Sequence, residues 1–290
     1  MLPSSMPSGL TLLSEAEAPR AHLGESPRWD GHAWWWVDAA AGTVWRRTPG
    51  GSAELIADRG GRVSLCQPVP GGGVLIADDT VPRLISRTAT GWRVGGAWCA
   101  PLVPAGWLVN DGIVDARGRL WIGSVHPDRE AGAGQLIMAE AGGSPTVVRD
   151  GFALSNGMAW DPAGTILWHA DSGERIVWAH QIDVAQGRLV GSTVALRLDA
   201  SEGMPDGLAS DPEGGLWVAL YGDGQVRRYV DGCLDRVIEV PTPQTTALAL
   251  GGPAGDELLI TTAREGFDDR RSVAEPLAGR FFRARLRQRA

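Results

Sequence analysis

The chain has 290 residues, 40 of them glycine and 19 proline, and its 34 acidic residues outnumber its 27 basic residues to give a net charge of −7. Every basic residue is Arg, which excludes a lysine Schiff base and a P-loop, and an acidic chain without a basic face does not suit a nucleic-acid backbone. Three widely spaced cysteines without a C-x-x-C pair imply neither a disulfide framework nor a structural zinc site.

The N-terminal segment "MLPSSMPSGLTLL" has no basic region and no long apolar run, and no window of about 18 apolar residues follows it. Together with the few cysteines, this predicts a soluble, cytoplasmic protein that does not contact a membrane. We expect residues 1–7 to form a flexible tail and residues 10–16 to form the first strand.

A repeated phrase organises the rest of the chain. In its clearest copies, a polar residue and a Gly lead into a short apolar run, a turn containing Asp and Gly, and a second apolar run containing Trp. Short runs rich in Val, Ile, Leu and Trp between turn residues are typical of β-hairpins. In chain order, the copies begin at Gly24, Val63, Gly112, Gly157, Gly207 and Thr245.

A period of about 40 to 50 residues with several strands in each copy is typical of a β-propeller. We therefore predict an all-β fold in which residues 1–290 form one six-bladed propeller domain, with no segment of convincing helical periodicity. An open ring would leave exposed sheet edges, so we expect residues 10–16 to pair with residues 279–286. In that last segment, apolar residues alternate with Arg, as in a strand with one solvated face.

The residues that open the copies carry side-chain oxygens. In a propeller the first strand of each blade lines the channel, so these side chains converge, and hard oxygen ligands with negative charge suit a divalent cation. Asn-Gly and Asp-Gly are also typical of tight turns, but their recurrence at one repeat position favours a shared site. For Asp111, a ligand role and a supporting role both remain open. The candidates are Glu25, Asn110, Asp111, Asn156 and Asp206.

Other candidates have simpler explanations. Asp161 and Asp211 precede Pro at predicted hairpin tips, at the opposite end of the blade from the openers, and are interpreted as turn formers. We interpret four of the histidines as sheet or surface residues, whereas His126 directly follows a predicted inner strand and is a candidate pocket residue. Neither G-x-S-x-G nor H-E-x-x-H occurs. The four histidines are His22, His32, His169 and His180.

Five segments together resemble the gluconolactonase and senescence-marker-protein (regucalcin) family. They are "GESPRWD", "NDGIVDARGRLWIGS", "SNGMAWDPAG", "MPDGLASDPEGGLWVA" and "TTALALGGPAGDELLITTAREG", and they cover nearly the whole chain in family order. The resemblance implies a six-bladed propeller that hydrolyses lactones with one divalent cation in its tunnel. It further implies that Glu25, Asn156 and Asp206 hold the cation and that Asp206 also helps to deprotonate water.

The same resemblance assigns the substrate contacts. Asn110 matches a substrate-binding Asn, and an acidic contact falls near Asp128, with His126 close by. Sugar lactonases of the family commonly have an Arg where this chain has Leu108, and an alkyl group cannot replace five hydrogen-bond donors. With Trp107 beside it, Leu108 favours a less polar lactone or ester over a sugar lactone.

The sequence leaves the cation and the reaction partly open. Ca²⁺ is expected first, while Zn²⁺, Mg²⁺, Mn²⁺ and Fe²⁺ are alternatives for the same oxygen ligands. Phosphotriester hydrolysis, a biosynthetic reaction on an apolar substrate and non-catalytic calcium binding are the alternative functions. We expect a small-molecule substrate, no nucleic-acid partner, and a monomer or weak dimer.

Overall fold

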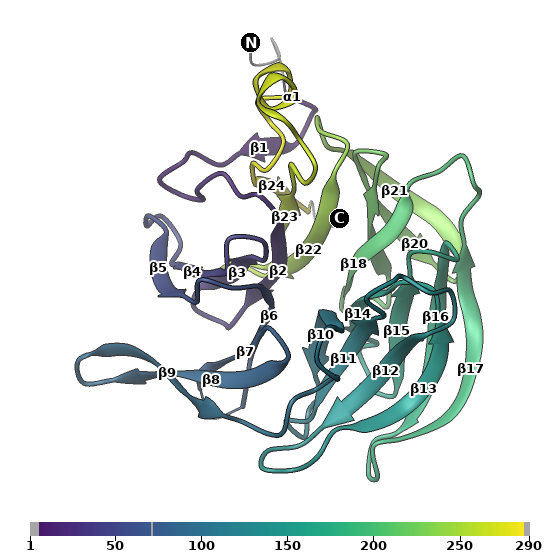
Figure 1. Cartoon of the computed structure of the whole chain (residues 1–290). Helices are drawn as coiled ribbons and strands as arrows, with labels where there is room; N and C mark the ends of the chain where they lie inside the picture. The colour runs from purple at the N-terminus through teal and green to yellow at the C-terminus, as the bar shows by residue number, and fades with distance from the viewer. Residues whose placement is uncertain (1–5, 71, 287–290) are drawn as a thin grey trace.

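The computed structural model describes residues 6–70 and 72–286. Within these residues the strands form six antiparallel four-stranded sheets, which we number as blades I to VI in chain order (Figure 1). The first strand of each blade contacts the first strand of the next blade, and blade VI contacts blade I in the same way. This arrangement confirms the predicted all-β six-bladed propeller.

Each of the first five blades uses four consecutive strands of the chain. Blade I contains β2 (Gly24–Trp29), β3 (Trp34–Asp38), β4 (Thr43–Arg47) and β5 (Glu54–Asp58), and blade II contains β6 (Val63–Pro68), β7 (Val74–Asp78), β8 (Val81–Thr88) and β9 (Gly91–Ala97). Blade III contains β10 (Leu108–Val114), β11 (Leu120–Val125), β12 (Gly134–Ala139) and β13 (Thr146–Phe152). Blade IV contains β14 (Ser155–Trp160), β15 (Ile166–Asp171), β16 (Ile176–Asp183) and β17 (Arg188–Arg197), and blade V contains β18 (Met204–Ser210), β19 (Leu216–Tyr221), β20 (Gln225–Val230) and β21 (Cys233–Glu239).

Blade VI joins the two ends of the described chain. It contains β22 (Thr245–Gly251), β23 (Glu257–Thr262), β24 (Phe282–Arg285) and the N-terminal strand β1 (Leu10–Leu12), which pairs antiparallel with β24. This confirms the predicted closure of the ring. A short helix that the sequence analysis did not predict, α1 (Asp269–Ala274), precedes β24, and its first turn is capped by the Asp268 carboxylate, which accepts the Arg271 N–H.

Two predictions concern the N-terminus and membranes. Of the predicted tail, residues 1–5 lie outside the described residues, and Met6 packs against the apolar cluster around Leu10 and Trp217. Among the helices of residues 6–70 and 72–286, none has the length and apolar character that crossing a membrane requires.

In the three clearest copies of the repeated phrase, an Asp at the start of the first hairpin turn accepts hydrogen bonds that fix the turn. The Asp115 carboxylate accepts the indole N–H of Trp121 at 3.0 Å, and that of Asp211 accepts the indole N–H of Trp217 at 2.7 Å. Both indoles are fully buried between blades. Asp161 accepts two backbone N–H groups across its own turn, at 2.7 Å each. These contacts confirm that Asp161 and Asp211 are turn formers.

The glycine that follows the polar opener is required by close packing of the inner strands. Gly112, Gly157 and Gly207 lie inside β10, β14 and β18, and none has a positive φ. A Cβ on Gly157 would lie 2.1 Å from the backbone oxygen of Asp206, and one on Gly207 would lie 2.5 Å from the Cα of Ala247. Gly157 and Gly207 therefore let neighbouring blades approach, whereas a Cβ on Gly112 would first meet the Trp121 oxygen of its own blade, at 2.5 Å. The tight-turn explanation does not apply to any of the three.

We predict that Gly157→Ala destabilises the fold by about 3 kcal/mol, because the added methyl group meets backbone that cannot move aside cheaply. Gly191→Ala is the matched control, since a Cβ there meets nothing within 4 Å and φ is not positive; it should change stability by less than about 0.5 kcal/mol. Chemical denaturation of both variants measures the difference. Equal stability of the two variants would contradict the close-approach argument.

Candidate functional site

A one-residue shift in strand pairing occurs in all six blades at the residues that face the axis. In blade IV, between the pairs Ser155–Asp171 and Met158–His169, β14 advances three residues while β15 advances two. The corresponding strand pairs of the other five blades shift in the same way. Such bulges re-aim side chains. Asn156 lies in the shift of blade IV.

The other openers lie at or inside the shifts of their own blades. Glu25 directly precedes the shift in β2, Asn110 and Asp111 lie in the shift of β10, and Asp206 lies in that of β18. Asp111 and Asp206 are 4% and 5% exposed, so these charged side chains are withdrawn from solvent.

The three carboxylates act on one another electrostatically. Burial raises the pKa of Glu25 to about 8, with the charge of Asp111 as the next cause. Burial, followed by the charges of Glu25 and Asp111, raises the pKa of Asp206 well above its ordinary value. The structure therefore brings together these three acids, which the sequence spreads over three blades.

The carboxylates of Asp111 and Asp206 differ in their hydrogen-bond partners. The Oδ1 of Asp111 accepts the backbone N–H of Gly112 at 2.7 Å and lies 3.8 Å from the Arg28 guanidinium. The Oδ1 of Asp206 is buried without a hydrogen-bond partner. A buried oxygen without a partner carries a large desolvation penalty, so Asp206 has ligand capacity that Asp111 has already used.

The two carboxamides are held by neighbouring groups. Ser172 donates its only hydroxyl proton to the Pro205 carbonyl at 2.6 Å, so it must accept the Asn156 Nδ2–H at 3.1 Å. Asn110 donates its Nδ2–H to the Ser155 carbonyl at 3.0 Å. Both amides are thereby oriented by contacts with the rest of blade IV and with blade V.

This set of donors fits a hard cation. Carboxylate and amide oxygens are the ligands that Ca²⁺ and Mg²⁺ prefer. The Oδ1 of Asp206 accepts no hydrogen bond, so it is available to coordinate such an ion. Considering His, Cys, Asp and Glu side chains alone, the described part of the chain contains no group of three placed to hold a metal ion. An ion here would depend on Asn156 as well as on the acids.

The predicted substrate residues lie at the start and end of the β10–β11 pair. Leu108 is 37% exposed and pairs with Val125. The Trp107 ring meets the His126 ring edge-on, with centroids 5.0 Å apart. The exposed Asp128 donates its backbone N–H to Nδ1 of His126 at 3.3 Å. The structure thus gathers Trp107, His126 and Asp128 beside Leu108. Leu108 stands two residues before Asn110 in the sequence.

Sequence reasoning missed several neighbours of the acids. Burial, followed by the charges of Glu265 and Asp206, raises the pKa of Tyr221 to about 12. Gln244 and Glu265 exchange two hydrogen bonds, of 3.0 and 2.9 Å. Arg28 directly follows "GESP", but neither it nor Tyr221 stands at an opener, so the repeat offers no signal for them.

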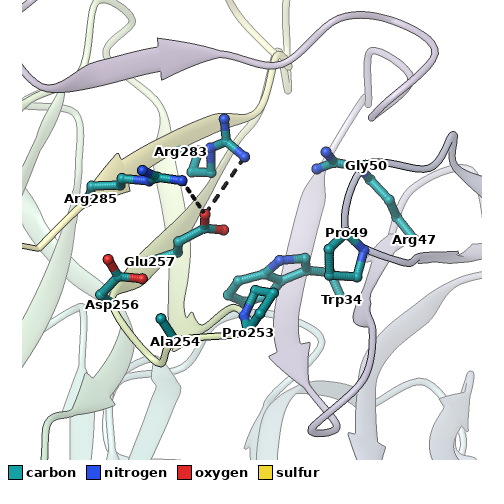
Figure 2. A pocket seen from close by; sticks show the side chains of 10 residues that line it. All are labelled: Trp34, Arg47, Pro49, Gly50, Pro253, Ala254, Asp256, Glu257, Arg283 and Arg285. Carbon is teal, nitrogen blue, oxygen red and sulfur yellow. Dashed lines mark ion pairs between the residues drawn. The ribbon is translucent and has the colours of Figure 1, made fainter.

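A separate cavity of about 360 Å³ lies between blades I and VI. Figure 2 shows Arg283 and Arg285 both directed at Glu257, each 3.7 Å away, above Trp34. None of the residues that line this cavity is a predicted site residue.

Comparison with known proteins extends these observations. Residues 23–264 match the family model described as SMP-30/Gluconolactonase/LRE-like region. The putative sugar lactone lactonase YvrE of Bacillus subtilis is 32% identical over 180 residues, which is 61% of each protein. The 6-deoxy-6-sulfogluconolactonase of Pseudomonas putida is 29% identical over 280 residues, 91% of each.

A solved structure agrees with the fold. The crystal structure of a calcium-binding protein, regucalcin, from Agrobacterium tumefaciens str. C58 superposes with a TM-score of 0.84 at 28% identity, covering 97% of this chain and 96% of that one.

We predict that Glu25 makes the cation-free protein less stable as pH rises from about 4.5 to about 8. Its pKa in the folded protein is raised, so over this range the unfolded chain gives up a proton that the folded chain keeps. Glu25→Gln should flatten this slope in denaturation measured with EDTA. Glu130→Gln, at an exposed position, is the control and should keep the native slope. An unchanged slope in Glu25→Gln would contradict the predicted burial penalty.

Proposed function

Because the chain belongs to the SMP-30/gluconolactonase/LRE-like family, we propose that it hydrolyses the ring ester of a lactone with the aid of a divalent cation in the tunnel. The observation that carries the proposal is the buried, unpartnered Oδ1 of Asp206 beside two further acids. The names of two relatives, a putative sugar lactone lactonase and a sulfogluconolactonase, support the reaction class.

Glu25, Asn156 and Asp206 would hold the cation, with Ca²⁺ as the first choice and Zn²⁺, Mg²⁺, Mn²⁺ and Fe²⁺ as alternatives. The regucalcin structure of A. tumefaciens, described as that of a calcium-binding protein, supports Ca²⁺. When bound, such a cation polarises an ester carbonyl and makes a nearby water more acidic. We assign Asp111 a supporting role, because its Oδ1 accepts the Gly112 N–H and lies 3.8 Å from Arg28.

Asp206 also takes the proton from the attacking water. The water oxygen bonds to the carbonyl carbon, the ring C–O bond breaks, and the proton held by Asp206 passes to the departing ring oxygen to give a hydroxy acid. Asn110, oriented by the Ser155 carbonyl, contributes a polar contact to the substrate. Deep burial keeps bulk water from competing for these groups.

The substrate end of the site combines polar and apolar groups. Leu108 and Trp107 offer carbon surface, while His126 and Asp128 offer hydrogen bonds. We infer a lactone with one apolar side, of lower polarity than an aldonolactone. This inference depends on Leu108, which supplies none of the five donors that an Arg would bring.

The proposal predicts cation-dependent hydrolysis of γ- and δ-lactones that EDTA abolishes and an added divalent cation restores. With the cation saturating, Asp206→Asn should stay roughly 10²- to 10⁴-fold below the native rate, the usual scale for a lost general base. Asn156→Ala is the control, because excess cation should restore much of its rate.

An aryl phosphotriester assayed in parallel separates the alternatives. Turnover of the phosphotriester alone would replace lactonase with phosphotriesterase activity, and cation binding without turnover of either class would indicate a binding protein. Full rescue of Asp206→Asn by added cation would place the base elsewhere.

For specificity, we predict that Leu108→Arg raises kcat/KM for an aldonolactone relative to an alkyl lactone by about 10-fold, since the new donors pair with ring hydroxyls. Leu55→Arg is the matched control, because Leu55 is also exposed, at 48%, but lies on the outer strand β5. A shift of preference toward the alkyl lactone would show that residue 108 does not meet the substrate.

A further inference from the structure

A continuous chain of polar side chains crosses blade IV from its inner strand to its outer strand. Ser155 Oγ lies 2.6 Å from His169 Nε2, His169 Nδ1 lies 3.3 Å from His180 Nε2, and His180 Nδ1 lies 2.8 Å from Ser192 Oγ. These residues come from β14, β15, β16 and β17 in turn. The Asp206 mechanism uses none of them.

The two histidines are neutral and enclosed. Both are fully buried, and burial followed by the charge of Arg149 lowers the pKa of His180 to about 3. The Phe152 ring lies 4.5 Å from His169, and Trp178 stacks on His180 at 6.2 Å. A neutral imidazole has one donor and one acceptor nitrogen. The donor-to-acceptor direction is therefore the same in all three hydrogen bonds of this series of side chains. The chain therefore forms a single unit.

The inner end of this hydrogen-bonded series, Ser155, contacts one of the two carboxamides and directly precedes the other in sequence. The backbone oxygen of Ser155 accepts the Asn110 Nδ2–H at 3.0 Å, and Asn156 is the next residue. Ser155 stands where the pairing of β14 and β15 shifts, so the regular ladder is interrupted after it and resumes at Met158. Gly123 leaves the space for its hydroxyl, since a Cβ there would lie 2.2 Å from Ser155 Oγ.

We propose that His169 is a positioning residue for the proposed hydrolysis: by anchoring Ser155, it fixes the substrate-binding Asn110 and the cation-binding Asn156. The proposal rests on the proposed function. At a bulge the backbone loses part of its pairing, and the short hydrogen bond from His169 replaces the missing restraint. His180 and Ser192 fix the orientation of the His169 ring, as outer-shell groups do for ligands elsewhere.

The test compares His169→Phe, which keeps the ring volume but removes both nitrogens, with His169→Gln, which can return a polar atom toward Ser155. Ser155→Ala removes the same hydrogen bond from its other end and guards against a folding defect in the Phe variant. Val177→Ala is the matched control, because Val177 is fully buried in the same blade but takes no part in the hydrogen-bonded series from Ser155 to Ser192. Each variant is assayed for kcat/KM, melting temperature, Ca²⁺ affinity by calorimetry, and the position of Asn110 by crystallography.

We expect His169→Phe and Ser155→Ala to lose roughly 10-fold in kcat/KM or Ca²⁺ affinity, with the Asn110 Nδ2–Ser155 O distance opened beyond hydrogen-bonding range. His169→Gln should recover most of the loss. His169→Phe and Ser155→Ala remove the same hydrogen bond. The double variant that combines them should therefore lose no more kcat/KM or Ca²⁺ affinity than either single variant. Val177→Ala should lose melting temperature but keep native kcat/KM.

The inference is overturned if His169→Phe and Ser155→Ala both match Val177→Ala in kcat/KM and Ca²⁺ affinity with Asn110 unmoved. Failure of the proposed function gives a different pattern, in which the native protein hydrolyses no lactone. In that case the Asn110 contact and the Ca²⁺ affinity still show whether His169 positions the carboxamides.

Discussion

The close approach of six inner strands at their register shifts is the constraint on which the rest of the structure depends. A bulge lies at the openers, and Gly157 and Gly207 beside two of them lack the side chain that would keep neighbouring blades apart. Fold and site are therefore not separable: the packing that closes the ring also gathers acids from three blades into one space.

That gathering sets the chemistry. Burial, followed by the charges of the neighbouring carboxylates, raises the pKa values of Glu25 and Asp206. The three acids therefore cannot all be ionised unless positive charge is present. Arg28 supplies part of that charge, because it lies 3.8 Å from Asp111 and also acts on Glu25. The remaining charge imbalance centres on Asp206, whose Oδ1 is buried without a hydrogen bond. In the proposed function, a divalent cation would balance this charge at Asp206, the residue that the reaction would also use as a base.

The sequence predicts the parts of the structure that repeat. Six copies of one phrase indicate the six blades, and alternation in residues 279–286 indicates the closing strand. Features that occur once have no such signal: Arg28, Tyr221 and the His169–His180 pair become neighbours of the site only through tertiary packing. Helix α1 has six residues, too few to show helical periodicity. The role of glycine in the Asn-Gly and Asp-Gly pairs is ambiguous in the sequence, because close strand packing and tight turns both select glycine. Only the backbone angles distinguish the two roles.

The histidines show how a residue can be structural and still matter for chemistry. The prediction that His169 and His180 are sheet residues agrees with their place in β15 and β16 and with their full burial, which lowers the pKa of both. Their hydrogen bonds nevertheless end at Ser155. The carbonyl of Ser155 accepts the Asn110 carboxamide N–H, and Asn156 is the next residue. A bulge that exposes side chains to a site also loosens the backbone that carries them. Blade IV restores that backbone through its own side chains, from the outer strand inward.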